Sequence, residues 1–521
     1  MISTLHADAT TVSTTSRRWW ALAALSIAVF AIGIDTMVLT VALPTLARDL
    51  DATTSALQWF STSYTLVLAA ALLPLGSLGD RIGRRRLLLA AMALFGIASL
   101  ACAYSQTAVE LIGARAVLGL AAAAIMPMSM AVLPILFPRQ AEQQRALTIW
   151  VTATALGLPL GPILGGWLLE HFWWGSVFLV NIPLVCVGLV AVTLLLPESR
   201  SSDPGRFDLP GAILSSTGLL ALTYGFISAG SDGWGAAHVL LTLTVGAALL
   251  AVFLLWEKRT DHPLIDLALL SDRDYASGAG LSTLVNFVMF GLLFSLPLYL
   301  GAVLGADALG IGVRLLPMIA GLVVGTRVAD LLARVLGAGA VIALGFAALV
   351  GACLLGVTTT AATGYGLTAA WLTIAGLGLG LVMPTAMAAA IGKLTPERSG
   401  AGSALIQALR QAGGTIGVAV LGTVLAAGYH AHLPSMSLPE PAASAVSDSV
   451  SSGVTVARQL GLPALEEQVQ AAFVHGMVSA LWVSGALAVV GGIVAAVVLP
   501  LRRPDDAADA EEPGGVHEHV D

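Results

Sequence analysis

The sequence has 521 residues, of which 57% are hydrophobic and 11% are charged, and its mean hydropathy is +0.89. Soluble domains average about 25% charged residues, so this composition excludes a water-soluble protein and indicates an all-α integral membrane protein. The net charge of −7 is local, because residues 504–521 include seven acids and no Lys or Arg. We expect this tail to be disordered and solvated.

Apolar stretches long enough to cross a bilayer recur along the whole chain, since about 20 such residues suffice. Residues 1–16 are polar and do not resemble a signal peptide, so the first span should stay in the protein. The sequence predicts fourteen spans, at 19–44, 57–79, 87–105, 109–136, 146–169, 175–197, 207–229, 236–256, 275–303, 308–329, 338–358, 366–391, 402–428 and 476–500.

The distribution of Lys and Arg tests this count. With both termini in the cytoplasm, nineteen of these residues lie inside, three lie outside and two, Arg115 and Arg410, lie within spans. One span more or fewer would destroy the asymmetry. Only Lys258 and Lys393 are lysines, a bias typical of GC-rich bacteria. We therefore expect a multi-pass protein of a bacterial plasma membrane with both termini cytoplasmic.

Asp35 lies deep inside the first span, where a lone carboxylate is costly and usually marks a proton, ion or substrate path. Arg115 lies at a similar depth in the fourth span, ~10 Å from its outer end against ~13 Å for Asp35. We predict that the two side chains meet. The pair is either a proton-exchanging site or a permanent salt bridge that locks spans 1 and 4.

A glycine- and arginine-rich loop joins spans 2 and 3, and a weaker copy, residues 325–334, joins spans 10 and 11. This repetition predicts duplicated helix bundles with a substrate site at their interface. Charge pairs of the first loop are candidates to hold one half against the other. The alternative is that its arginines only set the orientation of the protein in the membrane, as cytoplasmic arginines do. The candidate gating residues are Gly76, Asp80, Arg81, Gly83, Arg84 and Arg85.

The fifth span has glycines spaced about four residues apart, on one helix face, which allows another helix to pack closely. Prolines in the same stretch should bend the helix. The segment is either a gating helix or a tightly packed one. Its residues of interest are Gly157, Gly161, Pro162, Gly165 and Gly166.

Side chains for cargo contact are weaker candidates, since Met and aromatic surfaces adapt to varied ligands but most of them simply pack. They are Trp59, Tyr64, Met126, Asn286 and Phe290. Gln407, Arg410 and Gln411 form a polar patch on span 13. We find no metal spacing, phosphate loop or nucleophile elbow, so we expect no cofactor, no enzymatic activity and no nucleic-acid partner.

The first loop resembles motif A of the major facilitator superfamily, and Gly157–Gly166 resembles its motif C, which is typical of antiporters. Ile34–Pro44 is similar to the span 1 motif of the fourteen-span drug:proton antiporters. The resemblance covers Trp19 to about Leu501. It implies the major facilitator fold, with two six-helix halves and spans 7 and 8 inserted between them.

This resemblance implies proton-driven efflux of amphipathic small molecules, cations among them, such as drugs or antibiotics, by a monomer in the lipid bilayer. The alternatives are a dedicated exporter of one endogenous metabolite or self-made antibiotic, and a membrane sensor without transport. The expected units are a tail at 1–16, an N-terminal half at 17–200, spans 7 and 8 with connectors at 201–274, a C-terminal half at 275–503 with an outer loop at 429–475, and the tail at 504–521.

Two segments should be dispensable for the site. The outer loop around Pro434–Ala457 is rich in Ser, Ala and Pro, so we expect it to bury little surface and to tolerate shortening. Spans 7 and 8 carry no charge in mid-span. We therefore expect a peripheral hairpin that faces lipid and contributes nothing to the cavity near Asp35.

Overall fold

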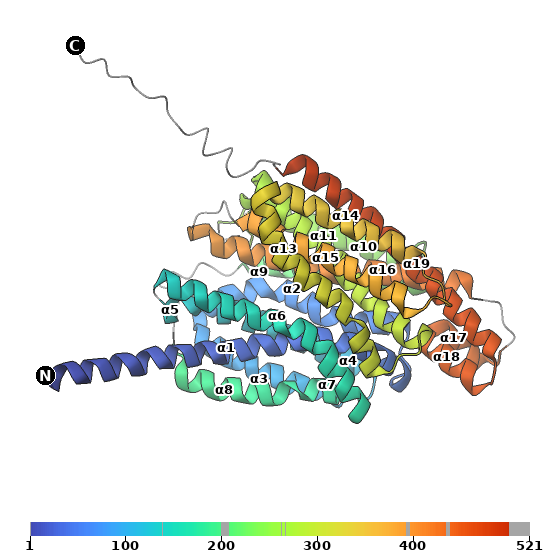
Figure 1. Ribbon diagram of the computed structural model, residues 1–521, viewed down its shortest axis with the longest axis horizontal. Helices are drawn as coiled ribbons and strands as arrows, with labels where there is room; N and C mark the ends of the chain where they lie inside the picture. The colour runs from blue at the N-terminus through green and yellow to red at the C-terminus, as the bar shows by residue number, and fades with distance from the viewer. Residues whose placement is uncertain are drawn as a thin grey trace, which may run out of the picture.

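The computed structural model describes residues 2–137, 139–198, 208–261, 263–265, 267–391, 396–433 and 438–499, with most side chains from Arg17 onward. These residues form helices and turns and contain no strand, as the sequence predicts (Figure 1). The acidic tail at 504–521 lies outside the described residues, as do the side chains of 1–16.

The N-terminal half consists of six long helical segments, one of them split between α7 and α8. Its helices are α1 (Ile2–Asp49), α2 (Thr54–Ile82), α3 (Arg84–Ala103), α4 (Ala108–Ala131), α5 (Leu133–Leu136), α6 (Gln140–His171), α7 (Ser176–Leu179) and α8 (Asn181–Leu195). The inserted pair follows as α9 (Leu209–Asp232) and α10 (Ala237–Glu257).

The C-terminal half has the same plan, with additional short helices at one end. It comprises the 3-10 turn Leu269–Ser271, α11 (Arg273–Leu298), the π turn η2 (Tyr299–Val303), α12 (Ala308–Arg314), α13 (Leu316–Leu336), α14 (Ala338–Val357), α15 (Tyr365–Ile391), α16 (Pro396–His432), α17 (Glu440–Asp448), α18 (Val450–Gln459) and α19 (Pro463–Val498).

Short polar side chains and glycines set several helix ends. Thr53, Thr107 and Asp307 accept hydrogen bonds from the backbone N–H groups that open α2, α4 and α12, which satisfies donors with no partner inside the helix. Gly83 and Gly337 separate α2 from α3 and α13 from α14, with φ of 116° and 83°. Other residues rarely adopt such angles, so these glycines permit the two tight turns.

Helix packing is repeated between the halves. In the first, α1 packs on α6 and α8, α2 on α4, and α3 on α4 and α8. In the second, α11 packs on α16 and α19, α13 on α15, and α14 on α15 and α19. Each contact of the first set has its counterpart in the second, as expected of a duplicated six-helix unit. The first half lies in the lower part of Figure 1 and the second in the upper part.

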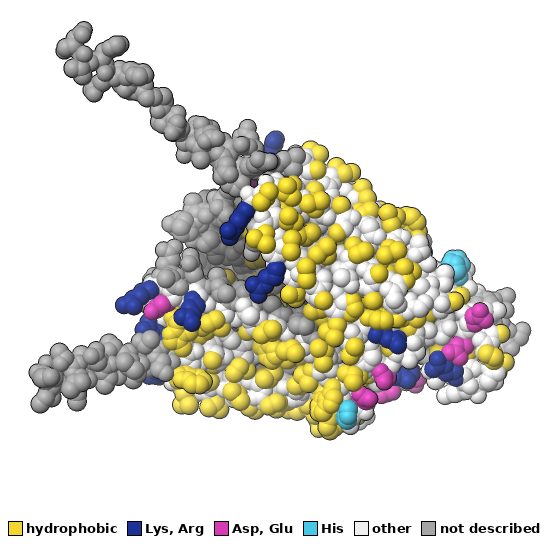
Figure 2. All heavy atoms as spheres, viewed as in Figure 1, with side chains coloured by type: hydrophobic (Ala, Val, Ile, Leu, Met, Phe, Trp, Pro, Cys, Tyr) yellow, Lys and Arg dark blue, Asp and Glu magenta, His cyan; other side chains and the backbone are white. Residues whose placement is uncertain are grey.

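The bundle is built to lie in a membrane. Twelve helical segments of the described chain are long and apolar enough to cross one. The other two expected spans, α2 and α6, have 29 and 32 residues, more than the ~20 that crossing needs. Apolar side chains cover the middle of the surface, and charged ones gather toward its two ends (Figure 2). We call these ends the arginine end, at the α2–α3 turn, and the cap end, at α17 and α18.

The α9–α10 hairpin has no counterpart in either half. α9 packs against α2 of the first half and α16 of the second, and α10 packs on α9. Thr423 of α16 donates a hydrogen bond to the Phe226 carbonyl of α9. On α10, Leu240, Leu241 and Leu255 are more than half exposed. The pair therefore bridges the halves along one side and presents its outer helix to lipid.

The loop at the cap end differs from expectation. α17 and α18 bury Val446, Val450 and Val454 in the main core, so the prediction that this segment buries little surface is wrong. Tyr429 donates a hydrogen bond to the Val446 carbonyl, at 2.7 Å. Val450 and Val454 are four apart on α18 and share one face of that helix, while Val446 lies on α17, beyond the extended backbone of Ser449. Residues 434–437 of this loop lie outside the described part.

Candidate functional site

Asp35 and Arg115 form an ion pair at the centre of the N-terminal half, as their matched depths predict. Arg115 Nη1 lies 2.7 Å from Asp35 Oδ2, and their side chains are 2% and 0% exposed. The Arg115 Nε donates to the Phe60 carbonyl at 3.2 Å. A charge-assisted bond of this length, buried away from water, holds α1, α2 and α4 together while Asp35 is ionised.

Asn181 is a third member of this site that sequence reasoning missed. Its Nδ2 donates to Asp35 Oδ1 at 3.1 Å and to Ser99 Oγ at 3.2 Å, and Asn181 is fully buried. Its Oδ1 is buried without a hydrogen-bond partner among the described residues. An amide can donate to a carboxylate and accept from a carboxylic acid. Asn181 is therefore suited to either protonation state of Asp35.

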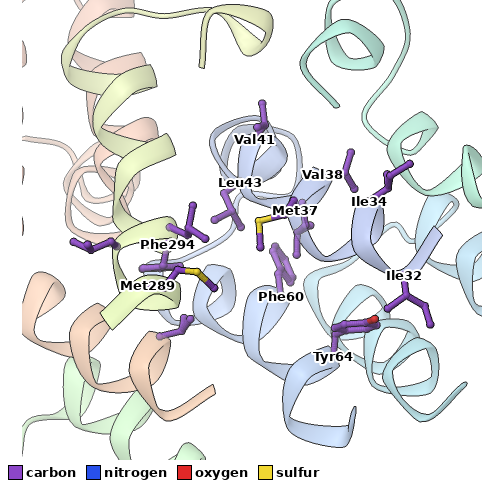
Figure 3. Close-up of a cluster of buried hydrophobic side chains, with 14 of the residues drawn as sticks. Ile32, Ile34, Met37, Val38, Val41, Leu43, Phe60, Tyr64, Met289 and Phe294 are labelled. Carbon is purple, nitrogen blue, oxygen red and sulfur yellow. The ribbon is translucent and has the colours of Figure 1, made fainter. Parts of the chain in front are cut away.

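Aromatic rings enclose the pair. The guanidinium carbon of Arg115 lies 4.6 Å from the centre of the Tyr64 ring and 5.9 Å from that of Phe178. Tyr64, Met37 and Phe60 belong to a larger apolar cluster that continues to Met289 and Phe294 of the other half (Figure 3). The rings attract the cation through their faces and exclude water, which strengthens the ion pair.

A small cavity lies beside the pair, between the two halves. About 20 Å³ of it is open to the centre of a water molecule, which is room for about one water. Drug-sized cargo therefore requires the halves to separate. Asp35 itself is not among the lining residues, which are Thr36, Leu39, Thr40, Ser61, Tyr64, Thr65, Arg115, Phe290, Leu293, Phe294 and Val418.

Of the five cavity candidates taken from the sequence, Tyr64 and Phe290 line this cavity. Trp59 packs with Leu66 and Leu219 in a separate apolar cluster. Met126 packs partly buried against the main core. Asn286 donates to the backbone carbonyl of Arg410 at 2.8 Å, so it joins α11 to α16.

The glycine face of α6 packs directly on the part of α1 that carries Asp35. A Cβ on Gly157 would lie 2.6 Å from the carbonyl carbon of Gly33, and one on Gly161 would lie 2.7 Å from the Met37 Cβ. A Cβ on Gly165 would lie 2.7 Å from Val38. No side chain fits at these three positions without moving α1, so α1 and α6 must shift together.

The end of the same motif meets the opposite half. A Cβ on Gly166 would lie 2.7 Å from the Ala308 carbonyl of α12, and the Pro162 carbonyl lies against Gly312. α6 thus contacts the Asp35 helix along one stretch and the C-terminal half along the next. This arrangement can transmit a change at Asp35 across the interface.

The loop after α2 makes its described contacts within the N-terminal half. Glu198, at the end of α8, accepts a hydrogen bond from the Arg85 backbone N–H at 3.3 Å and pairs with Arg86 at 3.5 Å. Arg84 donates to the Ala131 carbonyl of α4. Arg81 is exposed, Gly76 has ordinary contact with Pro127, and the Asp80 side chain lies outside the described part.

The cap end of the interface is closed by contacts between the halves. Gln58 Nε2 of α2 donates to the Ala419 carbonyl of α16 at 3.2 Å. Thr54 donates to the Asp448 carbonyl at the end of α17 at 2.9 Å. A Cβ on Gly301 of η2 would touch Pro44 of α1 at 3.4 Å. These contacts block access to the cavity from that end.

Among the described residues, no group of three His, Cys, Asp or Glu is placed to hold a metal ion. The ionisable chemistry near the cavity is that of Asp35 and Arg115, with Tyr64 beside them. The carboxylate can bind and release a proton, while the guanidinium stays charged in both states.

The comparisons with known proteins agree with this architecture. A family model described as the Major Facilitator Superfamily matches residues 25–418. Among solved structures, a bacterial homolog to the human lysosomal transporter Spinster, inward-facing and unoccupied, superposes with a TM-score of 0.63. The two share 15% identity, over 92% of this chain and 97% of that one, which shows a common fold.

Relatives with closer sequences are resistance and export proteins. The tetracenomycin C resistance and export protein of Streptomyces glaucescens is 32% identical, over 95% of this chain and 94% of its own length. The multidrug efflux pump LfrA of Mycolicibacterium smegmatis is 34% identical, over 94% and 99%. The puromycin resistance protein pur8 of Streptomyces alboniger is 33% identical, over 80% and 84%. The chain therefore belongs to the Major Facilitator Superfamily of membrane transporters.

Proposed function

We propose that this protein exports amphipathic small molecules, drugs or antibiotics among them, from a bacterial cell in exchange for protons. The observation that carries the proposal is the buried carboxylate of Asp35, bonded to Arg115 at 2.7 Å beside a cavity between the halves. Such a carboxylate is costly in a membrane and is found mainly on transport paths. The resistance and export relatives support cargo of this kind.

The coupling step is a change of partner at Asp35. A proton arriving on Asp35 neutralises the carboxylate and frees Arg115, which lines the cavity. Asn181 then accepts a hydrogen bond from the carboxylic acid through its unpartnered Oδ1. Because α6 packs on α1 around Asp35 and reaches α12, the altered pair favours a different arrangement of the halves.

The test is cargo-dependent proton release from liposomes that contain the purified protein. Asp35→Asn keeps the size of the side chain and removes the titratable group, so we expect proton exchange to stop while insertion persists. Asp35→Glu should retain part of the activity. Asp232→Asn, at a half-exposed aspartate of α9, is the matched control and should behave as wild type. Undiminished proton release by Asp35→Asn would leave the pair as a permanent lock between α1 and α4.

The second candidate is a dedicated exporter of one metabolite or self-made antibiotic. It is favoured by a relative described as a resistance and export protein for a single compound, tetracenomycin C. Growth of an efflux-deficient bacterial host that expresses this chain, across a panel of toxic compounds, separates the two. Protection against several unrelated scaffolds supports the broad exporter, and protection against one supports the dedicated exporter.

A further inference from the structure

Arg410 of α16 is a partly buried cation with no counter-charge among the described residues. Its Nη1 lies 3.4 Å from Gln407 Oε1, and its Nε is buried with no hydrogen-bond partner. Among the described residues, none forms an ion pair with Arg410. Asp35 is already bonded to Arg115. The membrane interior of the described protein therefore carries one uncompensated guanidinium.

Arg410 lies on the arginine-end side of the cavity. Val418, which lines the cavity, follows it by eight residues on the same helix, or ~12 Å at the rise of an α-helix. Thr415 of α16 donates to Thr65, another lining residue, at 2.8 Å. Helical side chains lean toward the helix N-terminus, so Arg410 leans toward the arginine end, on the side away from the closed cap.

Arg410 has two polar, partly exposed neighbours on its own helix. Gln407, Arg410 and Gln411 are all partly exposed, whereas Leu405 and Ile406 one turn earlier are buried against α11 and α15. The three side chains carry donors, and the two glutamines add amide oxygens. Gln407, Arg410 and Gln411 therefore form a polar face on the helix whose Val418 lines the cavity.

An unpaired guanidinium in a membrane protein is unfavourable unless it faces water or meets an anion. While the arginine end is open, water can solvate Arg410. Once that end closes around cargo, the water is lost and the charge needs a partner. The fork of N–H donors in Arg matches the two oxygens of a carboxylate, or the oxygen of an acidic phenol or enol.

We propose that Arg410, with Gln407 and Gln411, binds the acidic group of an anionic cargo, whose apolar body reaches the Phe290 and Phe294 rings. This inference rests on the proposed export function and specifies its substrate class. A cationic cargo would meet Arg410 at the entrance and Arg115 in the cavity, with Asp35 shielded behind Arg115. The charge distribution thus favours anions over the cations suggested by family resemblance.

The test compares two dyes that share one xanthene ring system, anionic fluorescein and a cationic rhodamine ester. Their binding to the purified full-length protein in detergent is measured by equilibrium dialysis at neutral pH. We expect wild type to bind fluorescein more tightly. Arg410→Gln should weaken fluorescein binding about 10-fold to 100-fold and leave the rhodamine ester unaffected or bound more tightly. Arg410→Lys keeps the positive charge but not the forked N–H donors, so its loss of fluorescein affinity should be smaller than that of Arg410→Gln.

Arg327→Gln, which removes an exposed cation from α13, is the control and should bind both dyes as wild type does. The proposal is overturned if wild type prefers the rhodamine ester, if Arg410→Gln binds fluorescein undiminished, or if it loses both dyes equally. If Arg410→Gln does not fold, the wild-type preference and the Arg410→Lys variant decide. Binding in detergent needs no gradient, so its outcome is independent of the Asp35→Asn test of proton coupling.

Discussion

Arg115 and Arg410 lie in opposite halves of one duplicated bundle, and their surroundings differ. Arg115 is 1% exposed, bonded to a carboxylate and enclosed by two aromatic rings. Arg410 is partly exposed, with an amide oxygen at 3.4 Å and an Nε that has no partner. The first charge is neutralised by Asp35 within the fold, and the second has no ion-pair partner among the described residues. The two arginines lie on helices that do not correspond in the two halves, since α16 is the counterpart of α6 and α15 that of α4.

The turns at the arginine end show the same divergence on a smaller scale. The N–H of Gly83 donates to the Gly79 carbonyl, and that of Gly337 donates to the Ala333 carbonyl in the same way. Next to Gly83, Glu198, which follows α8, pairs with Arg86. Next to Gly337, Leu499, which follows α19, packs on Gly339. The backbone of the repeat is retained while the charges are concentrated in the N-terminal half.

The largest expected effect is the difference in protein stability between variants of Arg115 and variants of Arg410. Arg115→Gln should lower the free energy of unfolding by about 3–5 kcal/mol, because Asp35 stays buried without its counter-charge. Arg410→Gln removes an unpaired charge and should leave stability unchanged or raise it. Thermal unfolding in detergent measures both, and the double variant Asp35→Asn/Arg115→Gln should recover part of the loss. An equal loss at both arginines would mean that Arg410 has a counter-charge within the fold.

Part of this difference between the surroundings of Arg115 and Arg410 can be predicted from the sequence. Depth along each span predicts that Asp35 meets Arg115, since helical rise converts residue number into distance. It does not identify Asn181, which is 146 residues from Asp35 and lies at the start of its helix, where a polar residue is unremarkable. That Arg410 has no ion-pair partner among the described residues is likewise a tertiary property, which only the packed bundle shows.

The next effect concerns how firmly the cap end joins the halves. α18 contacts α1 of the first half and η2 and α19 of the second. Replacing residues 438–460 with a flexible Gly/Ser linker should therefore lower thermal stability and export, contrary to the tolerance predicted from composition. Val454→Ala alone should cost about 2 kcal/mol through lost burial.

Lengthening the α9–α10 turn at Gly235 by two residues is the control for the cap, since a Cβ there would meet open space. It should leave melting temperature and export unchanged. Export at wild-type level after replacement of 438–460 would show that the buried valines of the cap stabilise only the cap itself.

The smallest expected effect is on the α9–α10 hairpin, which bridges the halves without lining the described cavity. Single cysteines across Leu214–Ser228 should react poorly with water-soluble thiol reagents. Thr223 and Ile227 are buried in the bundle, at 0% and 1% exposure, and outward positions such as Leu220 meet lipid. Glycine-turn variants such as Gly235→Cys should label readily and show that the reagent is active. Labelling within Leu214–Ser228 that cargo suppresses would place α9 on the transport path. The surroundings of Arg115 and Arg410 would then no longer describe that path without α9.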